Sequence, residues 1–177
     1  DEALQAYGSV PVVLDPVMVA TSGDLLLMQD AIDLLKATLL RRADLVTPNL
    51  NEAAWLTAQP LAETDQAMER QASQILALGA KAVLMKGGHG QGDEARDFFT
   101  NGVQHQWFSA PRHATRNTHG TGCTLSSAIA AGLAKGENFP TALAGAKAYI
   151  SAAIAAADRL VIGQGNGPVH HFHALWK

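Results

Sequence analysis

Residues 117–124 read Asn-Thr-His-Gly-Thr-Gly-Cys-Thr, and this glycine-rich stretch leads into a segment with helical periodicity. Apolar side chains recur behind it at positions 125, 128, 129 and 133, the spacing of one buried helical face. Glycine lets the backbone turn sharply and approach a ligand closely, and the free N–H groups of a helix start attract negative charge. The stretch is therefore either a loop that binds a phosphate or a developing oxyanion, or an ordinary tight turn with a threonine cap.

The single cysteine of the chain, Cys123, falls in the first turn of that predicted helix. A helix start favours the thiolate, so Cys123 could act as a base on a substrate hydroxyl or as a covalent nucleophile. A buried cysteine can instead be a small apolar filler of a core. One cysteine cannot form an internal disulfide, which favours a reducing, cytoplasmic location.

The composition is typical of a globular domain. Of the 177 residues, 47% are hydrophobic and 16% are charged, and the formal net charge is −3. No apolar run approaches the roughly 20 residues of a membrane span, and a chain with this charge has no basic footprint for nucleic acid. We therefore expect a single domain over residues 1–177 that binds neither nucleic acid nor a membrane.

Short apolar runs alternate with helical patterns along the chain. Strands are predicted at 10–14, 44–46 and 82–85, and helices at 28–41, 49–58, 64–78 and 140–159. Two period-2 segments flank Asn101-Gly102, which predicts a β-hairpin near 97–108. The alternation predicts an α/β fold with a mostly parallel central sheet flanked by helices on both faces.

Polar side chains follow each of the predicted strands. Asp15 could ligate or water-bridge Mg²⁺, or simply end its strand. Glu52 could hold a metal through water, or form a capping box with Asn49. Lys86, which leads into the glycines of residues 87–90, could reach the oxygens of a transferring phosphate. Because ligands of such sheets bind at the carboxyl ends of the strands, we expect these groups to share one crevice with the glycine loop.

Three histidines, His170, His171 and His173, lie close together near the end of the chain. A histidine cluster can bind a metal, but neither a carboxylate nor a cysteine accompanies this one. The pattern therefore favours a packed tail over a metal site.

Four segments in order, residues 13–23, 47–53, 83–89 and 115–123, together with the closing residues 165–171, extend a resemblance over essentially the whole chain. They resemble the ribokinase-like superfamily, and within it the hydroxymethylpyrimidine/phosphomethylpyrimidine kinases of thiamine biosynthesis. The cysteine at 123, where ribokinases usually have aspartate, narrows the resemblance to this branch, which shares it with some cysteine-type pyridoxal kinases. The resemblance implies a ribokinase-like fold. It also implies ATP-dependent phosphorylation of 4-amino-5-hydroxymethyl-2-methylpyrimidine and of its monophosphate.

The same resemblance implies roles for the glycine loop and the lysine. Gly120, Thr121 and Gly122 would form the anion hole, and Cys123 would be the catalytic base. Lys86 would contact the phosphates of ATP. In this arrangement the thiolate takes the hydroxyl proton while the loop and the lysine stabilise the charge on the moving phosphoryl group.

The remaining site residues are also implied only by the resemblance. Asp15 and Glu52 would lie near Mg²⁺, directly or through water. Lys147 and the helix around it would border the adenine of ATP. Val17 would sit at the edge of the pyrimidine pocket.

Members of the family usually begin with a strand and roughly two further βα units, and no part of the present sequence, which starts at Asp1, matches them. We therefore expect the chain to match the C-terminal two-thirds of the usual family domain and to lack most contacts to the pyrimidine. Two alternatives stay open: a cysteine-type pyridoxal kinase, and a truncated remnant that binds nucleotide without turnover. A homodimer is the assembly that the family resemblance allows.

Overall fold

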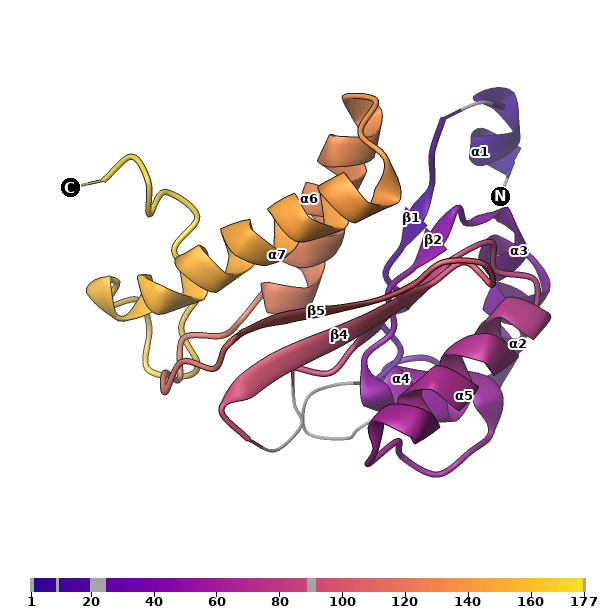
Figure 1. Ribbon diagram of the computed structural model, residues 1–177, viewed down its shortest axis with the longest axis horizontal. Helices are drawn as coiled ribbons and strands as arrows, with labels where there is room; N and C mark the ends of the chain where they lie inside the picture. Colours follow the sequence, from indigo (N-terminus) through magenta and orange to yellow (C-terminus); the bar gives the residue numbers. More distant parts are fainter. Residues whose placement is uncertain (1, 9, 20–24, 89–91, 177) are drawn as a thin grey trace. The chain divides into compact units, whose positions relative to one another are not determined.

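The computed structural model describes residues 2–8, 10–19, 25–88 and 92–176 (Figure 1). The chain groups into two compact units: the first unit comprises residues 1–91 and 96–108, and the second unit comprises residues 92–95 and 109–177. Within the described residues, no helix is long and apolar enough to cross a membrane. The single domain expected over residues 1–177 stays a prediction.

The sheet has five strands in the order β1-β2-β3-β4-β5 (Figure 1). They are β1 (Val13–Leu14), β2 (Leu45–Val46), β3 (Val83–Lys86), β4 (Glu94–Thr100) and β5 (His105–Pro111). The pairs β1–β2 and β2–β3 are parallel, whereas β3–β4 is antiparallel. The predicted parallel sheet with an added hairpin is therefore confirmed.

The first strand is shorter than the predicted run at 10–14. The backbone N–H of Val12 donates to the side chain of Asp44 at 2.8 Å, and Pro11 has no N–H to donate. Regular pairing therefore begins only at Val13, which faces Leu45.

The hairpin lies where Asn101-Gly102 predicted it, but its loop is longer than the two residues of the tightest turns. The side-chain oxygen of Asn101 accepts the N–H groups of Val103 at 3.0 Å and Gln104 at 2.7 Å. Gly102 has φ +86°, a conformation that favours glycine. Asparagine thus organises the turn through its own side chain.

The helices of the first unit follow the predicted order with one interruption. They are α1 (Glu2–Ala6), α2 (Gln29–Ala37), α3 (Leu39–Arg42), α4 (Leu50–Thr57) and α5 (Asp65–Ala77). The helix predicted at 28–41 is broken at Thr38, whose hydroxyl donates to the carbonyl oxygen of Leu34 at 2.7 Å; such back-bonding bends helices. Met28, at the expected inward spacing, instead precedes α2 and is exposed.

Helices α4 and α5 both contact β3, so the core of the first unit lies between them and the sheet. Ile32, Leu56, Ile75 and Met85 are fully or almost fully buried there. Helix α5 ends as predicted before Gly79, which has φ +112° and acts as the glycine beyond the C-cap.

The second unit is built on two long helices that pack against each other, α6 (Thr121–Ala134) and α7 (Phe139–Ala155), followed by η1 (Ala157–Arg159) (Figure 1). Their backbones approach closely, because a Cβ at Gly132 would lie 2.9 Å from that of Ala142. Leu125 and Ile129 are buried, as their spacing predicted. The helix predicted to reach residue 159 ends earlier, and its last residues form the 3-10 turn η1.

Candidate functional site

Three of the predicted site residues, Asp15, Glu52 and Lys86, meet in the first unit. Lys86 is the last residue of β3, and its ammonium nitrogen lies 2.6 Å from Oδ1 of Asp15 and 4.0 Å from Oε2 of Glu52. The side chains of Lys86 and Asp15 are only 13% and 15% exposed. The hydroxyl of Thr47 also donates to Oδ1 of Asp15, at 3.3 Å. Asp15 follows β1, Lys86 ends β3 and Glu52 lies in the first turn of the helix that follows β2, and the three form one charged cluster, as the sequence predicted.

Glu52 forms the capping box that its spacing from Asn49 predicted. Its Oε2 accepts the N–H of Asn49 at 2.7 Å, and its own N–H donates to Oδ1 of Asn49 at 2.8 Å. Burial raises the pKa of Glu52, whereas the Lys86 charge and the backbone N–H groups of Asn49 and Met18 act in the opposite direction. The cap therefore fixes the carboxylate beside the lysine.

The turn after Lys86 depends on glycine at position 87. The N–H of Gly87 donates to the buried carboxylate of Asp97 at 3.0 Å. A Cβ at Gly87 would lie only 2.1 Å from the carbonyl oxygen of Arg96 on β4. The chain can therefore pass close to β4 here only because no side chain intervenes. His89 and Gly90, and residues 20–23 of the first matching segment, lie outside the described residues.

The glycine loop lies in the second unit, at the start of α6. Gly120 is the N-cap residue, with φ +83°, and no side chain caps the helix. The hydroxyl of Thr121 instead donates backwards to the carbonyl oxygen of Thr118 at 2.7 Å. The expected threonine cap is therefore absent, although the N–H of Thr121 also donates to the carbonyl oxygen of Thr118, at 3.3 Å, as in a turn. The N–H groups of the next residues in the first turn of α6 have no partner within the helix and can bind an anion.

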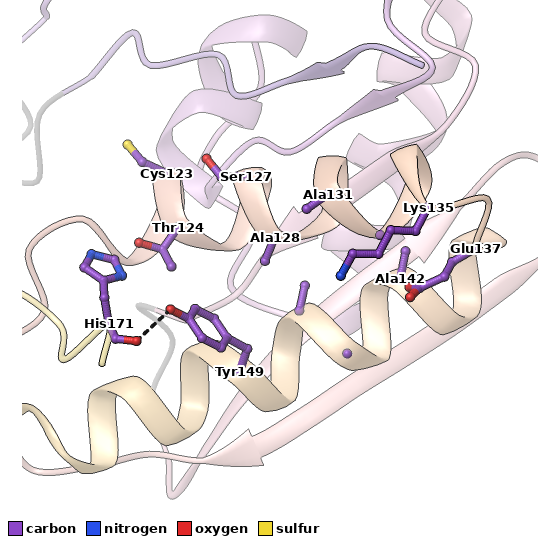
Figure 2. A pocket seen from close by; sticks show the side chains of 13 residues that line it. Cys123, Thr124, Ser127, Ala128, Ala131, Lys135, Glu137, Ala142, Tyr149 and His171 are labelled. Atoms are coloured by element: carbon purple, nitrogen blue, oxygen red, sulfur yellow. Dashed lines mark hydrogen bonds between the residues drawn. The ribbon is translucent and has the colours of Figure 1, made fainter. Parts of the chain in front are cut away.

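Cys123 is exposed in the first turn of α6, so it is not a core filler. Figure 2 shows its side chain directed away from Tyr149 and His171. An exposed thiol at an uncapped helix start suits proton transfer or nucleophilic attack. Gly120 to Cys123 thus lie together at the start of α6. The expectation that it shares a crevice with the Asp15–Glu52–Lys86 cluster stays a prediction.

A pocket of about 630 Å³ opens along α6 and α7 and has Cys123 among its lining residues (Figure 2). Thr124 and Ser127 contribute hydroxyl groups, and Lys135 contributes a positive charge. Tyr149 closes the pocket on the α7 side, where its hydroxyl donates to the carbonyl oxygen of His171 at 3.1 Å (Figure 2).

Sequence reasoning missed this pocket. The signal that was available is a row of residues with short side chains on the two closely packed helices, which leaves a hollow along their surface: Ala128, Ala131, Gly132, Ala142, Gly145 and Ala146.

Two residues implied by the resemblance lie elsewhere. Lys147 is half-buried on α7 and does not line this pocket. Val17 is 48% exposed, and its N–H donates to the carbonyl oxygen of Asp15 at 2.9 Å, so it stands next to the charged cluster. Both roles stay predictions.

The histidines near the end of the chain belong to a packed tail. The N–H of His170 donates to the carbonyl oxygen of Ala153 on α7 at 3.0 Å. His170 is buried, and its ring meets that of Trp176 edge to face. Throughout the described part of the chain, no group of three or more His, Cys, Asp or Glu residues is arranged to hold a metal.

Comparison with known proteins identifies the family. The sequence model of the phosphomethylpyrimidine kinase family matches residues 1–170. The chain is 57% identical over 176 residues to a hydroxymethylpyrimidine/phosphomethylpyrimidine kinase of Rhizobium meliloti. The aligned residues make up 99% of this chain and 66% of that protein. The namesake from Escherichia coli is 49% identical, with the same coverage. The chain belongs to the phosphomethylpyrimidine kinase family, and it spans 66% of the length of these relatives.

Solved structures agree with this assignment. The ADP complex of Bacillus subtilis pyridoxal kinase superposes with a TM-score of 0.89 at 33% identity, covering 98% of this chain and 64% of that one. Phosphomethylpyrimidine kinase from Clostridium difficile 630 gives a TM-score of 0.73 at 37% identity, covering 86% of this chain and 61% of that one. The α/β, ribokinase-like fold expected from the sequence is therefore confirmed.

Proposed function

We propose that the protein catalyses ATP-dependent phosphorylation of 4-amino-5-hydroxymethyl-2-methylpyrimidine, and of its monophosphate, in thiamine biosynthesis. The observation that supports this most strongly is the 57% identity, over 99% of this chain, to a kinase named for both steps. A bifunctional thiamine biosynthesis protein of Geobacter sulfurreducens, 44% identical over 171 residues, points to the same pathway.

The glycine loop supplies the chemical step in this proposal. The proton of the substrate hydroxyl passes to Sγ of Cys123, the oxygen bonds to the γ-phosphorus, and the bond from that phosphorus to ADP breaks. Gly120, Thr121 and Gly122 form the anion hole for the charge that develops on the phosphoryl oxygens, and the N–H of Thr121 exchanges its 3.3 Å bond to the carbonyl oxygen of Thr118 for this role. Such preorganised donors commonly contribute about 10²–10³ to the rate. An uncapped helix start beside an exposed thiol supports these roles.

The charged cluster handles the phosphates of ATP. Lys86 exchanges its contact with Asp15 for the phosphate oxygens. Two carboxylates within reach of one ammonium also fit Mg²⁺, which keeps several water ligands and needs only one or two carboxylates. Asp15 and Glu52 would hold that ion, directly or through water, and it would neutralise phosphate charge when bound.

The remaining assignments follow the family. Val17 would border the pyrimidine, and Lys147 the adenine. A homodimer in a cytoplasmic setting completes the proposal, supported by the family resemblance and the unpaired cysteine. Light scattering of the purified protein would test the dimer.

A second candidate is phosphorylation of pyridoxal. Pyridoxal kinases superpose closely on this chain, including one from Staphylococcus aureus bound to an ATP analogue and pyridoxal, with a TM-score of 0.87 at 30% identity. A third is nucleotide binding without turnover, the other alternative that the sequence leaves open.

One experiment separates these candidates. The protein is incubated with ATP and Mg²⁺ plus the pyrimidine alcohol, its monophosphate or pyridoxal, and products are identified by mass spectrometry. We expect the mono- and diphosphate of the pyrimidine at higher kcat/KM than pyridoxal phosphate. A preference for pyridoxal would support the second candidate. ATP binding by calorimetry, without turnover of any substrate, would support the third.

A further inference from the structure

We propose that Asn117 is a positioning residue, which fixes the glycine loop by tying it to η1 through Asp158 and to the segment before the tail through Gly167. The inference rests on the proposed kinase function. It assigns a role to residues that touch neither the thiol nor the first amide groups of α6.

The side-chain amide of Asn117 joins three segments of the second unit. Its Nδ2 donates to Oδ1 of Asp158 at 3.0 Å and to the carbonyl oxygen of Ala157 at 3.3 Å. Its Oδ1 accepts the N–H of Gly167 at 3.0 Å. Both ends of the amide are therefore used, and they link the approach to α6 with η1 and with the segment that precedes the tail.

Asp158 strengthens the same link. Its Oδ1 also accepts the hydroxyl of Thr115, and the Thr115 oxygen in turn accepts the N–H of Asn117 at 3.0 Å. A carboxylate that accepts two donors from one short segment holds that segment more strongly than neutral acceptors would. The turn leading to the glycine loop is thus held against η1, which follows α7.

The residue directly before the N-cap glycine is held on both sides. The N–H of His119 donates to the carbonyl oxygen of Gly167 at 3.0 Å, and its carbonyl oxygen accepts the N–H of Val169 at 3.3 Å. Val169 is buried, and the next residue, His170, is bonded to α7. The position of Gly120 is therefore set by residues 167–169 as well as by its own helix.

Asn117 and Gly167 also fit each other sterically. A Cβ at Gly167 would lie 2.2 Å from Oδ1 of Asn117, so any side chain there would displace the amide. Gly165, two residues earlier, has no atom within 4 Å of such a Cβ. The chain therefore offers a disruptive substitution and a matched control within one segment.

This arrangement predicts a defect in kcat rather than in substrate binding. A displacement of about 1 Å of catalytic groups can cost about 10²-fold in rate. An interaction made mainly in the transition state lowers kcat and kcat/KM together. Loss of the Asn117 link should therefore reduce kcat about 10- to 100-fold and leave the KM for ATP within about 3-fold.

The test compares a single variant, which disrupts the link, with a double variant designed to restore it. Asn117→Asp replaces the amide donor by a second carboxylate, which repels that of Asp158. Adding Asp158→Asn restores a donor, because the new amide can donate to the new carboxylate while Gly167 N–H keeps an acceptor. We expect kcat to fall in N117D and to recover to within about 3-fold of wild type in N117D/D158N. Asp158→Asn alone completes the double-mutant cycle, and we expect its kcat to fall less than that of N117D.

Gly167→Ala should lower kcat as N117D does, and Gly165→Ala should not. Unchanged kcat in N117D and G167A, or no recovery in the double variant, would overturn the inference.

A second readout is independent of turnover. Cys123 is the only thiol of the chain, so its alkylation by iodoacetamide reports directly on the loop. The alkylation rate should change at least about 3-fold in N117D and G167A and return in the double variant. An inactive wild type with this pattern of alkylation would contradict the proposed function alone. Equal alkylation rates in all variants would contradict the positioning role.

Discussion

The pair between Lys86 and Asp15 makes a quantitative prediction about stability. Lys86→Met keeps the length of the side chain but leaves Asp15 and Glu52 without their cation. Removing one partner of a buried ion pair typically costs about 3–5 kcal/mol. Because the Lys86 and Asp15 side chains remain 13% and 15% exposed, we expect a loss near the lower end, about 3 kcal/mol.

An exposed pair in the same unit provides the control. Lys81 contacts Asp44 at 2.8 Å, but these side chains are 59% and 30% exposed. Pairs of this kind contribute about 0.2–1 kcal/mol. Lys81→Met should therefore cost less than about 1 kcal/mol, although the charge removed is the same.

Urea unfolding at pH 7, followed by circular dichroism, measures both variants. At about 2–4 °C per kcal/mol for a chain of this size, thermal melts should show a drop of about 6–12 °C for Lys86→Met. Adding Asp15→Asn to that variant should recover more than half of the loss, because the unpaired charge is removed as well. Equal costs for Lys86→Met and Lys81→Met would refute the interpretation of a buried, strongly interacting cluster.

Three further predictions concern local structure. Asn49→Ala removes one half of the capping box and should cost about 1 kcal/mol in urea unfolding; no change would show that the cap is dispensable. Gly87→Ala should cost about 1–3 kcal/mol or more, since its Cβ would lie 2.1 Å from a backbone oxygen, whereas Gly88→Ala meets nothing within 4 Å and should change stability little. Equal effects of these two glycine substitutions would contradict the close passage by β4. Burial lowers the pKa of His170 below its ordinary 6.5, so stability from the neutral ring is present above that pH and is lost as pH falls towards the folded pKa. The melting temperature of wild type should therefore fall relative to His170→Phe between about pH 7.5 and pH 5, and a constant difference would contradict it.

Local spacing was enough to predict the features that depend on neighbouring residues. The capping box of Asn49 and Glu52 needs residues three apart, and Gly79 marks the end of α5 because few other residues adopt its conformation. The buried strands followed from short apolar runs. The hairpin turn at Asn101-Gly102 was placed correctly for the same reason, although its loop length was not.

Individual contacts between distant residues could not be predicted, although the gathering of Asp15, Glu52 and Lys86 could. The direct pair of Lys86 with Asp15 joins residues 71 positions apart, and the link from Asn117 to Gly167 joins residues 50 apart. The late start of β1 depends on the side chain of Asp44, 32 residues away from Val12. The sequence indicated which polar residues follow strands, but only the folded backbone determines which of them touch.

The roles of single site residues came mainly from the family resemblance. A glycine loop before a helix is compatible with a phosphate site or with a plain turn, and its residues alone do not distinguish the two. The structure shows that no threonine side chain caps α6 and that Cys123 is exposed, and the phosphate-binding role of the loop stays a prediction. The identity of the substrate depends on the relatives.

The most direct test of the proposed chemistry is transfer of the labelled γ-phosphate of ATP to the pyrimidine alcohol in a single turnover. Wild type and Cys123→Ala are compared at saturating ATP, with ATP affinity measured separately by calorimetry. A general base contributes about 10²–10⁴ to the rate, so we predict transfer by wild type and a loss of at least about 10²-fold in the variant at nearly unchanged ATP affinity. Equal rates in the two proteins, or no transfer by wild type despite bound ATP, would contradict the account.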